Sequence, residues 1–157
     1  MKFCKKTYTT EDGIHLRNFF ASQKDLRSIR VDFSSWIGVE MLRSVLFEIV
    51  ENCRQLNELS YIAPYHKHYL TPTESTALIQ KMAHVKNISI GGFSITSSPL
   101  FSVASPTFKV SALELSNVDE KICTCFIRNY TGLRRLVIKK FITNEVLQAI
   151  FQYLVSL

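Results

Sequence analysis

Two histidines stand close together in the segment YHKHY, which spans residues 65–69. Histidine nitrogens are common zinc ligands, and His66 and His68 could reach one ion from a strand or a turn. A stable site needs at least one further ligand, and the sequence places no Asp, Glu or Cys to complete the coordination shell. We therefore expect an exposed loop at this segment, of the kind that often contacts partners, and no metal site.

The four cysteines also lack the spacing of a metal-binding or redox centre. Cys4 and Cys53 stand alone, and no cysteine belongs to a CxxC pair. Cys123 and Cys125 are two residues apart in a segment that we expect to be helical, where their side chains point to different faces. We interpret the cysteines as reduced side chains that mostly pack in the core.

Serine, carboxylate and isolated histidine side chains give no sign of a catalytic arrangement. Ser97, Ser98 and Ser102 lack the GxSxG pattern of a nucleophile elbow, and no pair of carboxylates stands out for acid–base chemistry. His15 and His84 are better explained as surface or hydrogen-bonded structural residues. We expect no enzyme and no cofactor; a hydrolase or transferase would have to assemble its site from residues that are distant in the sequence.

A short hydrophobic frame recurs five times and defines the elements that must position any functional side chain. It consists of an apolar residue, two others, an apolar residue, one other and an apolar residue. Repeats of this pattern are typical of leucine-rich repeats, in which each unit is a short strand followed by a helix. The frames begin at Leu26, Leu56, Val85, Val110 and Leu133, with spacings of 30, 29, 25 and 23 residues, and Leu157 could open a sixth.

The segments between the frames have the apolar spacing of helices. We predict helices over residues 38–52, over 76–82 with Thr73 as a candidate cap, over 119–130, and from Thr143 or Asn144 to the end. The third gap, residues 95–108, is different because Pro99 and Pro106 interrupt helical hydrogen bonding. This gap predicts an irregular or short helical connection.

The sequence therefore predicts a single α/β domain over residues 1–157. Its form would be a leucine-rich-repeat solenoid with a curved parallel sheet on the concave side and helices on the convex side. The five strands are expected near residues 26–31, 56–61, 85–90, 110–115 and 133–138. Because neither end looks like a polar capping repeat, we expect part of a longer array. The alternative is a doubly wound α/β domain, against which the short, semi-polar strands and the absence of a glycine-rich loop argue.

The polar positions of each frame would line the concave side, where partners of solenoids dock. The apolar positions point inward and stack on those of the next repeat, since one repeat alone cannot bury its face. We therefore expect the partner to be another protein that binds the intervening positions. The predicted partner-binding residues are Arg30, Asp32, Glu58, Asn87, Glu114, Arg135 and Lys139.

Composition and charge limit the remaining classes of protein. With 46% hydrophobic and 20% charged residues, the chain has the profile of a soluble globular protein. Its start lacks the apolar segment of a signal peptide and no stretch is long enough to span a membrane, so we expect a cytoplasmic or nuclear protein without a membrane partner. The net charge of +6 could favour nucleic acid, but the basic residues are dispersed and have no interleaved aromatic side chains, so we do not expect a nucleic-acid partner. The alternative is an electrostatic nucleic-acid binder. Such a binder would use Arg134, Arg135, Lys139 and Lys140.

With its five frames and the segment ENCRQLNEL at residues 51–59, the chain resembles the ribonuclease-inhibitor-like and cysteine-containing leucine-rich repeats, particularly those of F-box proteins. Those repeats often carry a cysteine three residues before the first leucine, as Cys53 stands before Leu56. The pattern departs from the family in the other repeats, where Met82, Thr107 and Tyr130 occupy the equivalent position.

The resemblance covers about residues 14–157 and implies a recognition domain. It suggests the substrate-binding region of an F-box type ubiquitin-ligase receptor, with the ligand-sensing region of an innate-immune sensor or a scaffold protein as the alternative. The segment from Thr143 to Leu157 also looks like the opening of an F-box. It is too short to fold as one, which favours a repeat helix.

Overall fold

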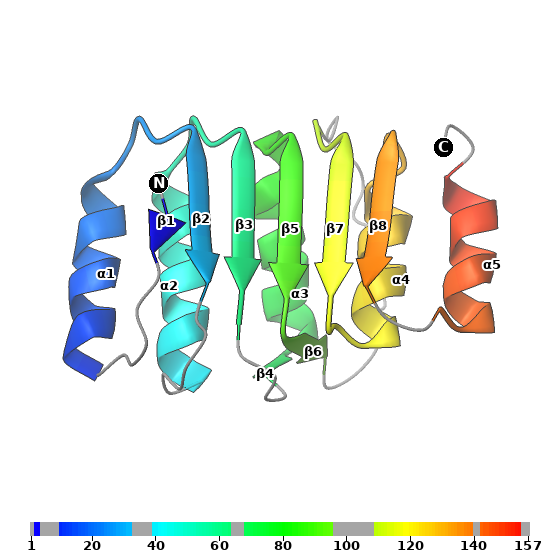
Figure 1. Ribbon diagram of the computed structural model, residues 1–157, viewed down its shortest axis with the longest axis horizontal. Coiled ribbons are helices and arrows are strands. Elements are labelled where there is room, and N and C mark those ends of the chain that lie inside the picture. Colours follow the sequence, from blue (N-terminus) through cyan, green and yellow to red (C-terminus); the bar gives the residue numbers. More distant parts are fainter. Residues whose placement is uncertain are drawn as a thin grey trace.

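The computed structural model describes residues 2–3, 10–32, 39–63, 68–95, 109–139 and 142–154. Figure 1 shows a row of parallel strands with helices behind them. Every pair of neighbouring strands in this sheet is parallel. The sheet has six strands, in the spatial order β1 (Lys2–Phe3), β2 (Ser28–Asp32), β3 (Glu58–Ile62), β5 (Asn87–Gly91), β7 (Ala112–Ser116) and β8 (Arg135–Lys139).

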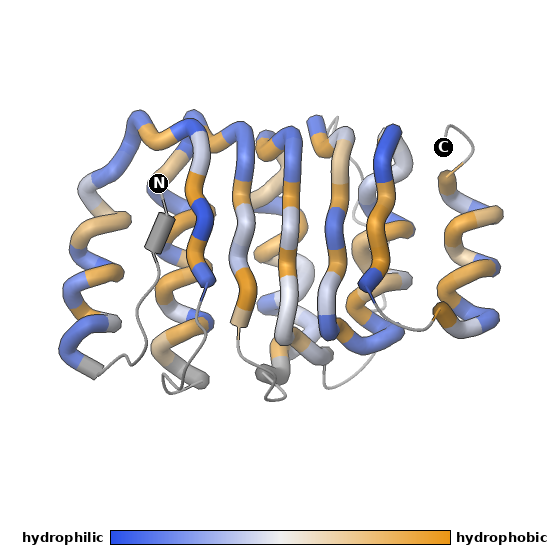
Figure 2. The backbone as a smooth tube through the Cα atoms, viewed as in Figure 1, coloured by the Kyte–Doolittle hydropathy of each residue, from blue (hydrophilic) through white to orange (hydrophobic). Residues whose placement is uncertain are grey.

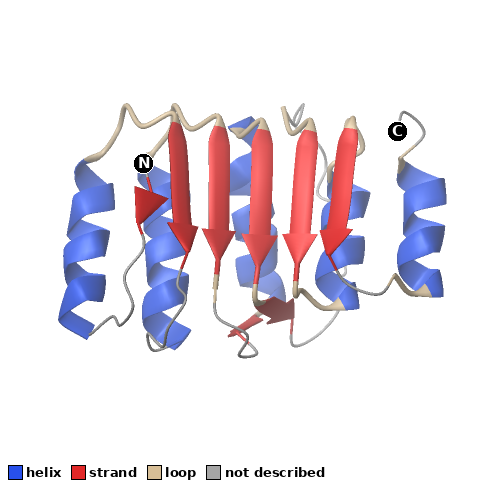
Figure 3. Cartoon of the chain, viewed as in Figure 1, coloured by secondary structure: helices blue, strands red, loops and turns tan. Residues whose placement is uncertain are grey.

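The helices form a second layer on one side of this sheet (Figure 3). A separate two-stranded parallel sheet pairs β4 (His68–Leu70) with β6 (Phe93–Ile95). This arrangement has the coarse form predicted, an α/β fold like that of leucine-rich repeats. The helices are α1 (Thr10–Ser22), α2 (Val39–Asn52), α3 (Pro72–Lys81), α4 (Glu120–Asn129) and α5 (Asn144–Tyr153), and the 3-10 helix η1 (Met82–His84) extends α3.

Strands β2, β3, β5 and β7 alternate between buried and accessible residues in the phase that the frames predict, whereas residues 136–138 of β8 are all half-buried. The inward residues of neighbouring strands are in register, so that Leu59 lies beside Ile88 and Ile88 beside Leu113. All three are at most 2% exposed. Figure 2 shows the alternation as orange and blue or pale bands along β2 and β7. The hydrophobic core is therefore a stack of repeats between the strand and helix layers.

Each strand begins two residues later than predicted and ends one residue later. The reason is that the first frame position belongs to the turn before the strand. The carbonyl oxygen of Arg27 accepts hydrogen bonds from the backbone N–H groups of Asn57, at 2.8 Å, and Glu58, at 3.1 Å. The regular ladder of β2 with β3 therefore starts only at Ser28.

The helix starts agree with the predictions to within one residue except for α3, which begins at Pro72 and not at Thr76 as predicted. Thr73 was the expected cap, but the cap is Thr71, with Pro72 in the first turn where its missing N–H costs nothing. Thr71 and Glu74 form a reciprocal capping box, in which the Thr71 hydroxyl accepts the Glu74 N–H at 3.2 Å and the Glu74 carboxylate accepts the Thr71 N–H at 2.8 Å. The other predicted starts are confirmed, with Asp119 capping α4 and Thr143 capping α5.

Several elements were not predicted from the sequence. These are α1, β1 and the small β4–β6 sheet. Part of the YHKHY segment, expected to be a loop, is the strand β4, in which the backbone of His68 pairs with that of Phe93. His66, the gap at residues 96–108, Lys140 and Leu157 lie outside the described residues.

The buried tyrosine hydroxyls of the core are hydrogen-bonded. The Tyr61 hydroxyl donates to the carbonyl oxygen of Leu42 in α2 at 2.6 Å, and the Tyr130 hydroxyl donates to that of Ile79 in α3 at 3.1 Å. These bonds connect the strand layer with α2 and the end of α4 with α3. The buried Nε2 of His84 has no hydrogen-bond partner among the described residues, so the expectation of a surface or hydrogen-bonded histidine is wrong for this atom. No described helix has both the length and the apolar character needed to cross a membrane.

Candidate protein-binding face

The side of the sheet away from the helices forms an open surface, which we call the strand face. It is made by the first, third and fifth residues of β2, β3, β5, β7 and β8, and the structure places all seven predicted partner-binding residues on it. Five of them line a hollow of about 650 Å³, whereas Asp32 and Lys139 stand at the strand ends outside its lining. Whether these residues bind a partner stays a prediction.

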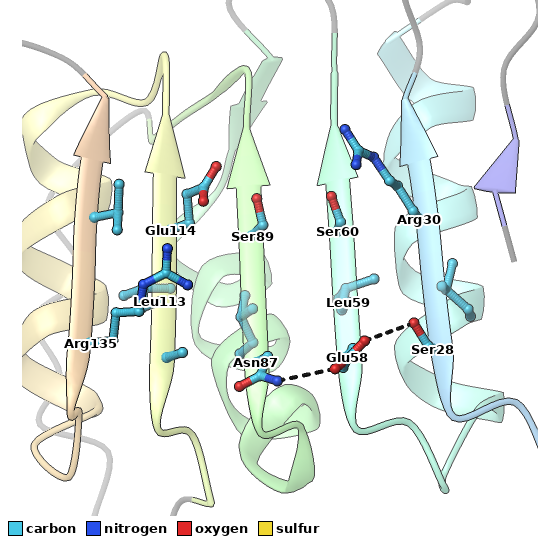
Figure 4. A pocket seen from close by; sticks show the side chains of 14 residues that line it. Ser28, Arg30, Glu58, Leu59, Ser60, Asn87, Ser89, Leu113, Glu114 and Arg135 are labelled. Atoms are coloured by element: carbon cyan, nitrogen blue, oxygen red, sulfur yellow. Dashed lines mark hydrogen bonds between the residues drawn. The ribbon is translucent and has the colours of Figure 1, made fainter.

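The centre of the hollow is formed by small side chains. Ser60 and Ser89 lie side by side on β3 and β5 (Figure 4). Ala112 on β7 is opposite Asn87, two residues nearer the strand start than the residue opposite Ser89. The predicted set left these residues out because it contained only charged and amide side chains. Ser60 and Ser89 occupy the same position in the frame, so the small size of these two neighbouring residues was the signal that could have revealed a depression.

Glu58 is the centre of a hydrogen-bonded cluster at one end of the hollow. Its carboxylate accepts a hydrogen bond from the Ser28 hydroxyl at 3.0 Å and another from the Asn87 side-chain amide at 3.3 Å (Figure 4). The register places these residues opposite one another on β2, β3 and β5. Such cross-strand bonds fix the orientation of the carboxylate, although the group remains exposed.

Charged side chains surround the rest of the hollow. Lys139 and Glu114 form an ion pair across β7 and β8, with 2.7 Å between Nζ and Oε1. Arg30 on β2 and Arg135 on β8 are both exposed and have no ion-pair partner among the residues that the structure describes. Their guanidinium groups lean inward over the sheet from its two sides (Figure 4). The strand face therefore offers two available cations on either side of a small-residue centre.

The described residues do not gather groups for metal binding. Within the described ranges, no set of three or more His, Cys, Asp or Glu side chains is arranged to hold an ion. Cys53, Cys123 and Cys125 are buried and free, which confirms the prediction for these three, and Cys4 lies outside the described part. Burial raises the pKa of the Cys53 thiol and that of the Cys125 thiol to about 11 each, so both stay protonated at neutral pH.

Comparison with known proteins identifies the fold. No protein-family model and no curated protein matches this sequence. Among solved structures, the chain is similar to the tropomodulin C-terminal domain of Caenorhabditis elegans, with 14% identity, a TM-score of 0.57 and coverage of 91% of both chains. It is also similar to leiomodin-1 actin-binding site 2, with 13% identity, a TM-score of 0.54 and coverage of 94% of this chain and 89% of the other.

These neighbours correct the resemblance drawn from the sequence. The ribonuclease-inhibitor-like and cysteine-containing repeats of F-box proteins are the wrong relatives, because the similar structures are tropomodulin and leiomodin domains. The position of Cys53 explains the error: in other repeats Met82 and Tyr130 fill it, and all three side chains are fully buried. The position requires an apolar residue of the core, so a cysteine there does not identify a family.

The correction also removes the basis for an F-box type ubiquitin-ligase receptor, and the neighbours give no support to an innate-immune sensor. At identities of 13% and 14% the likeness concerns the fold and not the ligand. The chain has an α/β fold of stacked strand–helix repeats, and this fold is similar to that of the tropomodulin C-terminal domain and of leiomodin-1 actin-binding site 2.

Proposed function

We propose that this chain is a protein-recognition domain that binds its partner through the strand face, and that it is not an enzyme. The proposal rests on the alternation of inward-facing and outward-facing residues along each strand. Inward residues such as Leu59 and Leu113 are committed to the core, while the residues between them form a hollowed surface of mixed charge. Such a surface supplies both signs of charge and accessible backbone at the centre, which suits a protein partner.

Actin is the first candidate for that partner. One structural neighbour is actin-binding site 2 of leiomodin-1, and the alignment covers 94% of this chain. Actin binding by this chain is an inference from that likeness, because a fold can carry different sites in different proteins. The test must therefore measure the strand face itself.

The experiment is co-sedimentation of the purified chain with actin filaments, accompanied by a titration of labelled monomeric actin. The test variant is Arg30→Glu with Arg135→Glu, which reverses the two available cations of the strand face. The matched control is Lys121→Glu with Arg128→Glu, which makes the same change in net charge at two exposed residues of helix α4 that have no ion-pair partner among the described residues. We expect the unmodified chain and the control to bind, and the strand-face variant to bind about tenfold more weakly.

Each outcome has a defined meaning. If neither form of actin binds to the unmodified chain, actin is excluded as the partner. If the two variants lose affinity equally, the strand face is not the contact surface and the effect is one of net charge. Circular dichroism of all three proteins establishes that they are folded, which is expected because the four substituted residues are exposed.

A further inference from the structure

The edge of the sheet where the strands begin carries a row of basic side chains that is separate from the strand face. The turns that lead into β2, β3, β5, β7 and β8 all lie along this edge, at the top of Figure 1. We call the row the basic rim. It consists of Lys24, Arg27, Arg54, Lys86, Lys109 and Arg134, all of them exposed.

The basic rim accounts for nearly all of the excess charge of the chain. The turns at residues 23–27, 53–57, 85–86, 109–111 and 130–134 contain these six basic residues and one acidic residue, Asp25. Their net charge of +5 compares with +6 for the whole chain, so the rest of the sequence is nearly neutral. The chain is thus electrically asymmetric, which its composition alone does not reveal.

The rim cations are available for an external partner. Asp25 accepts a hydrogen bond from the Gln55 side chain at 3.0 Å, and no rim residue has an ion-pair partner among the residues that the structure describes. At the opposite edge the helices begin with acidic residues, among them Glu74 and Glu120. An anionic partner is therefore attracted to the strand-start edge and repelled from the other.

The backbone holds the rim in a regular line. The carbonyl oxygens of Arg27, Asn57, Lys86 and Ser111 each accept two N–H groups from the following repeat, at 2.8–3.2 Å. Neighbouring strands lie about 4.8 Å apart, so Arg27, Lys86 and Arg134, which stand on every second strand, are spaced by about 10 Å. In an extended segment of polyproline II conformation, residues three apart lie on the same side and about 9 Å apart along the segment.

Helix stabilisation does not explain the rim. Basic residues favour the C-terminal end of a helix, but this effect is confined to the last turn. Neither α1 nor α2 has a basic residue in its last turn, although Lys24, Arg27 and Arg54 follow these helices in the turns beyond. The rim residues therefore have no role in the described fold that would require their charge.

We propose that the basic rim binds an acidic, extended segment of another protein, running across the strand starts with a carboxylate at about every third residue. Carboxylates of this spacing meet the cations of every second strand. A protein segment fits better than a nucleic acid because the only aromatic residue in the turns that carry the rim, Tyr130, is fully buried, so these turns offer no platform for stacking bases. Asp25 would also repel a phosphate backbone, whereas a peptide can place a basic or neutral residue beside it. The proposal does not depend on whether actin binds the strand face.

The test is the binding of a fluorescently labelled peptide with Glu at every third position and Ser or Gly between, followed by anisotropy at low ionic strength. The rim variant combines Arg27→Gln, Lys86→Gln and Arg134→Gln. The matched control combines Arg17→Gln, Lys121→Gln and Arg128→Gln, which removes the same charge from exposed positions on α1 and α4. We expect the rim variant to bind about tenfold more weakly, the control to bind within about twofold of the unmodified chain, and added salt to weaken binding.

Three results would overturn the proposal: no binding of the peptide to the unmodified chain, an equal loss in both variants, or tighter binding of an oligothymidine of equal charge. A second measurement uses only the unmodified chain, so it does not depend on the folding of a variant. Bound peptide should slow the acetylation of Lys86 and Lys109 and leave that of Lys121 unchanged, as read by mass spectrometry. Equal rates at all three lysines would contradict binding at the rim.

Discussion

The Tyr61 hydroxyl shows how a single residue connects the two layers of this fold. It is fully buried on β3 and donates its hydrogen bond to the carbonyl oxygen of Leu42 in α2. Replacing Tyr61 by Phe removes the donor and keeps the ring, so we expect a loss of about 1 kcal/mol in the free energy of unfolding. Urea denaturation measures this loss. The control is Tyr153→Phe on the half-buried side of α5, for which a change of similar size would show that the Tyr61 bond has no special weight.

The buried thiols make stability depend on alkaline pH. Burial raises the pKa of Cys53 and of Cys125 from 9.0 to about 11 in the folded chain, while both thiols ionise near 9 when the chain unfolds. The unfolded state then loses protons first. The stabilisation is present below pH 9 and is lost as the pH rises from about 9 to about 11.

We expect the free energy of unfolding, measured in urea at a series of pH values, to fall across this window. The fall should be smaller in the variant Cys53→Ala, which removes one of the two titrating thiols. An unchanged pH dependence in that variant would show that the Cys53 thiol is accessible to solvent in the folded chain.

Helix α3 illustrates what determines an element. Its capping box joins Thr71 and Glu74, and replacing Thr71 by Ala removes the hydroxyl that accepts the Glu74 N–H. We expect this substitution to cost about 1 kcal/mol of unfolding free energy. Thr73→Ala is the matched control, because Thr73 is exposed within the first turn and Ala has the higher helix propensity. Thermal unfolding that ranks the two variants the other way would contradict the observed cap.

The elements also show which features the sequence could predict. The spacing of apolar residues located five strands and four helices, because burial imposes that spacing directly. It placed the cap of α3 at Thr73, since two threonines close in sequence cannot be distinguished without the backbone geometry. It missed α1, whose residues from Thr10 to Ser22 form a weakly amphipathic helix, and β4, whose three residues are too few to show a period.

The candidate site was predictable in part for a related reason. The spacing of apolar residues in the frame predicts which residues face away from the core, so Arg30, Glu58 and Arg135 could be assigned to one surface. The hollow and the basic rim depend on the register of strands that are about 25 residues apart in sequence, as in the pairing of Ser89 with Glu114. Only the folded chain brings those residues side by side, and only then does the charge of successive turns add along one edge.

At the scale of the whole molecule, the sequences of the last two repeats can be aligned by the N-cap residues of their helices. Asp119 caps α4 and Thr143 caps α5, so equivalent residues are 24 positions apart. Ile127 in α4 corresponds to Phe151 in α5, yet Ile127 is fully buried and Phe151 is 81% exposed. The difference arises because α5 packs against α4, whereas no described element covers the far side of α5.

The stability lost when a helix side chain is replaced by Ala should therefore depend on whether a neighbouring repeat covers that side chain, and not on the size of the side chain. Replacing Ile127 by Ala leaves a cavity between repeats and should cost about 2–4 kcal/mol. Replacing the larger Phe151 by Ala should cost less than about 0.5 kcal/mol, because its ring is already in contact with water. Urea denaturation of both variants compares the two losses. A larger loss of unfolding free energy for Phe151→Ala would mean that contacts of the Phe151 ring hold α5 in place. That result would contradict a stack of equivalent repeats in which each repeat covers the one before it.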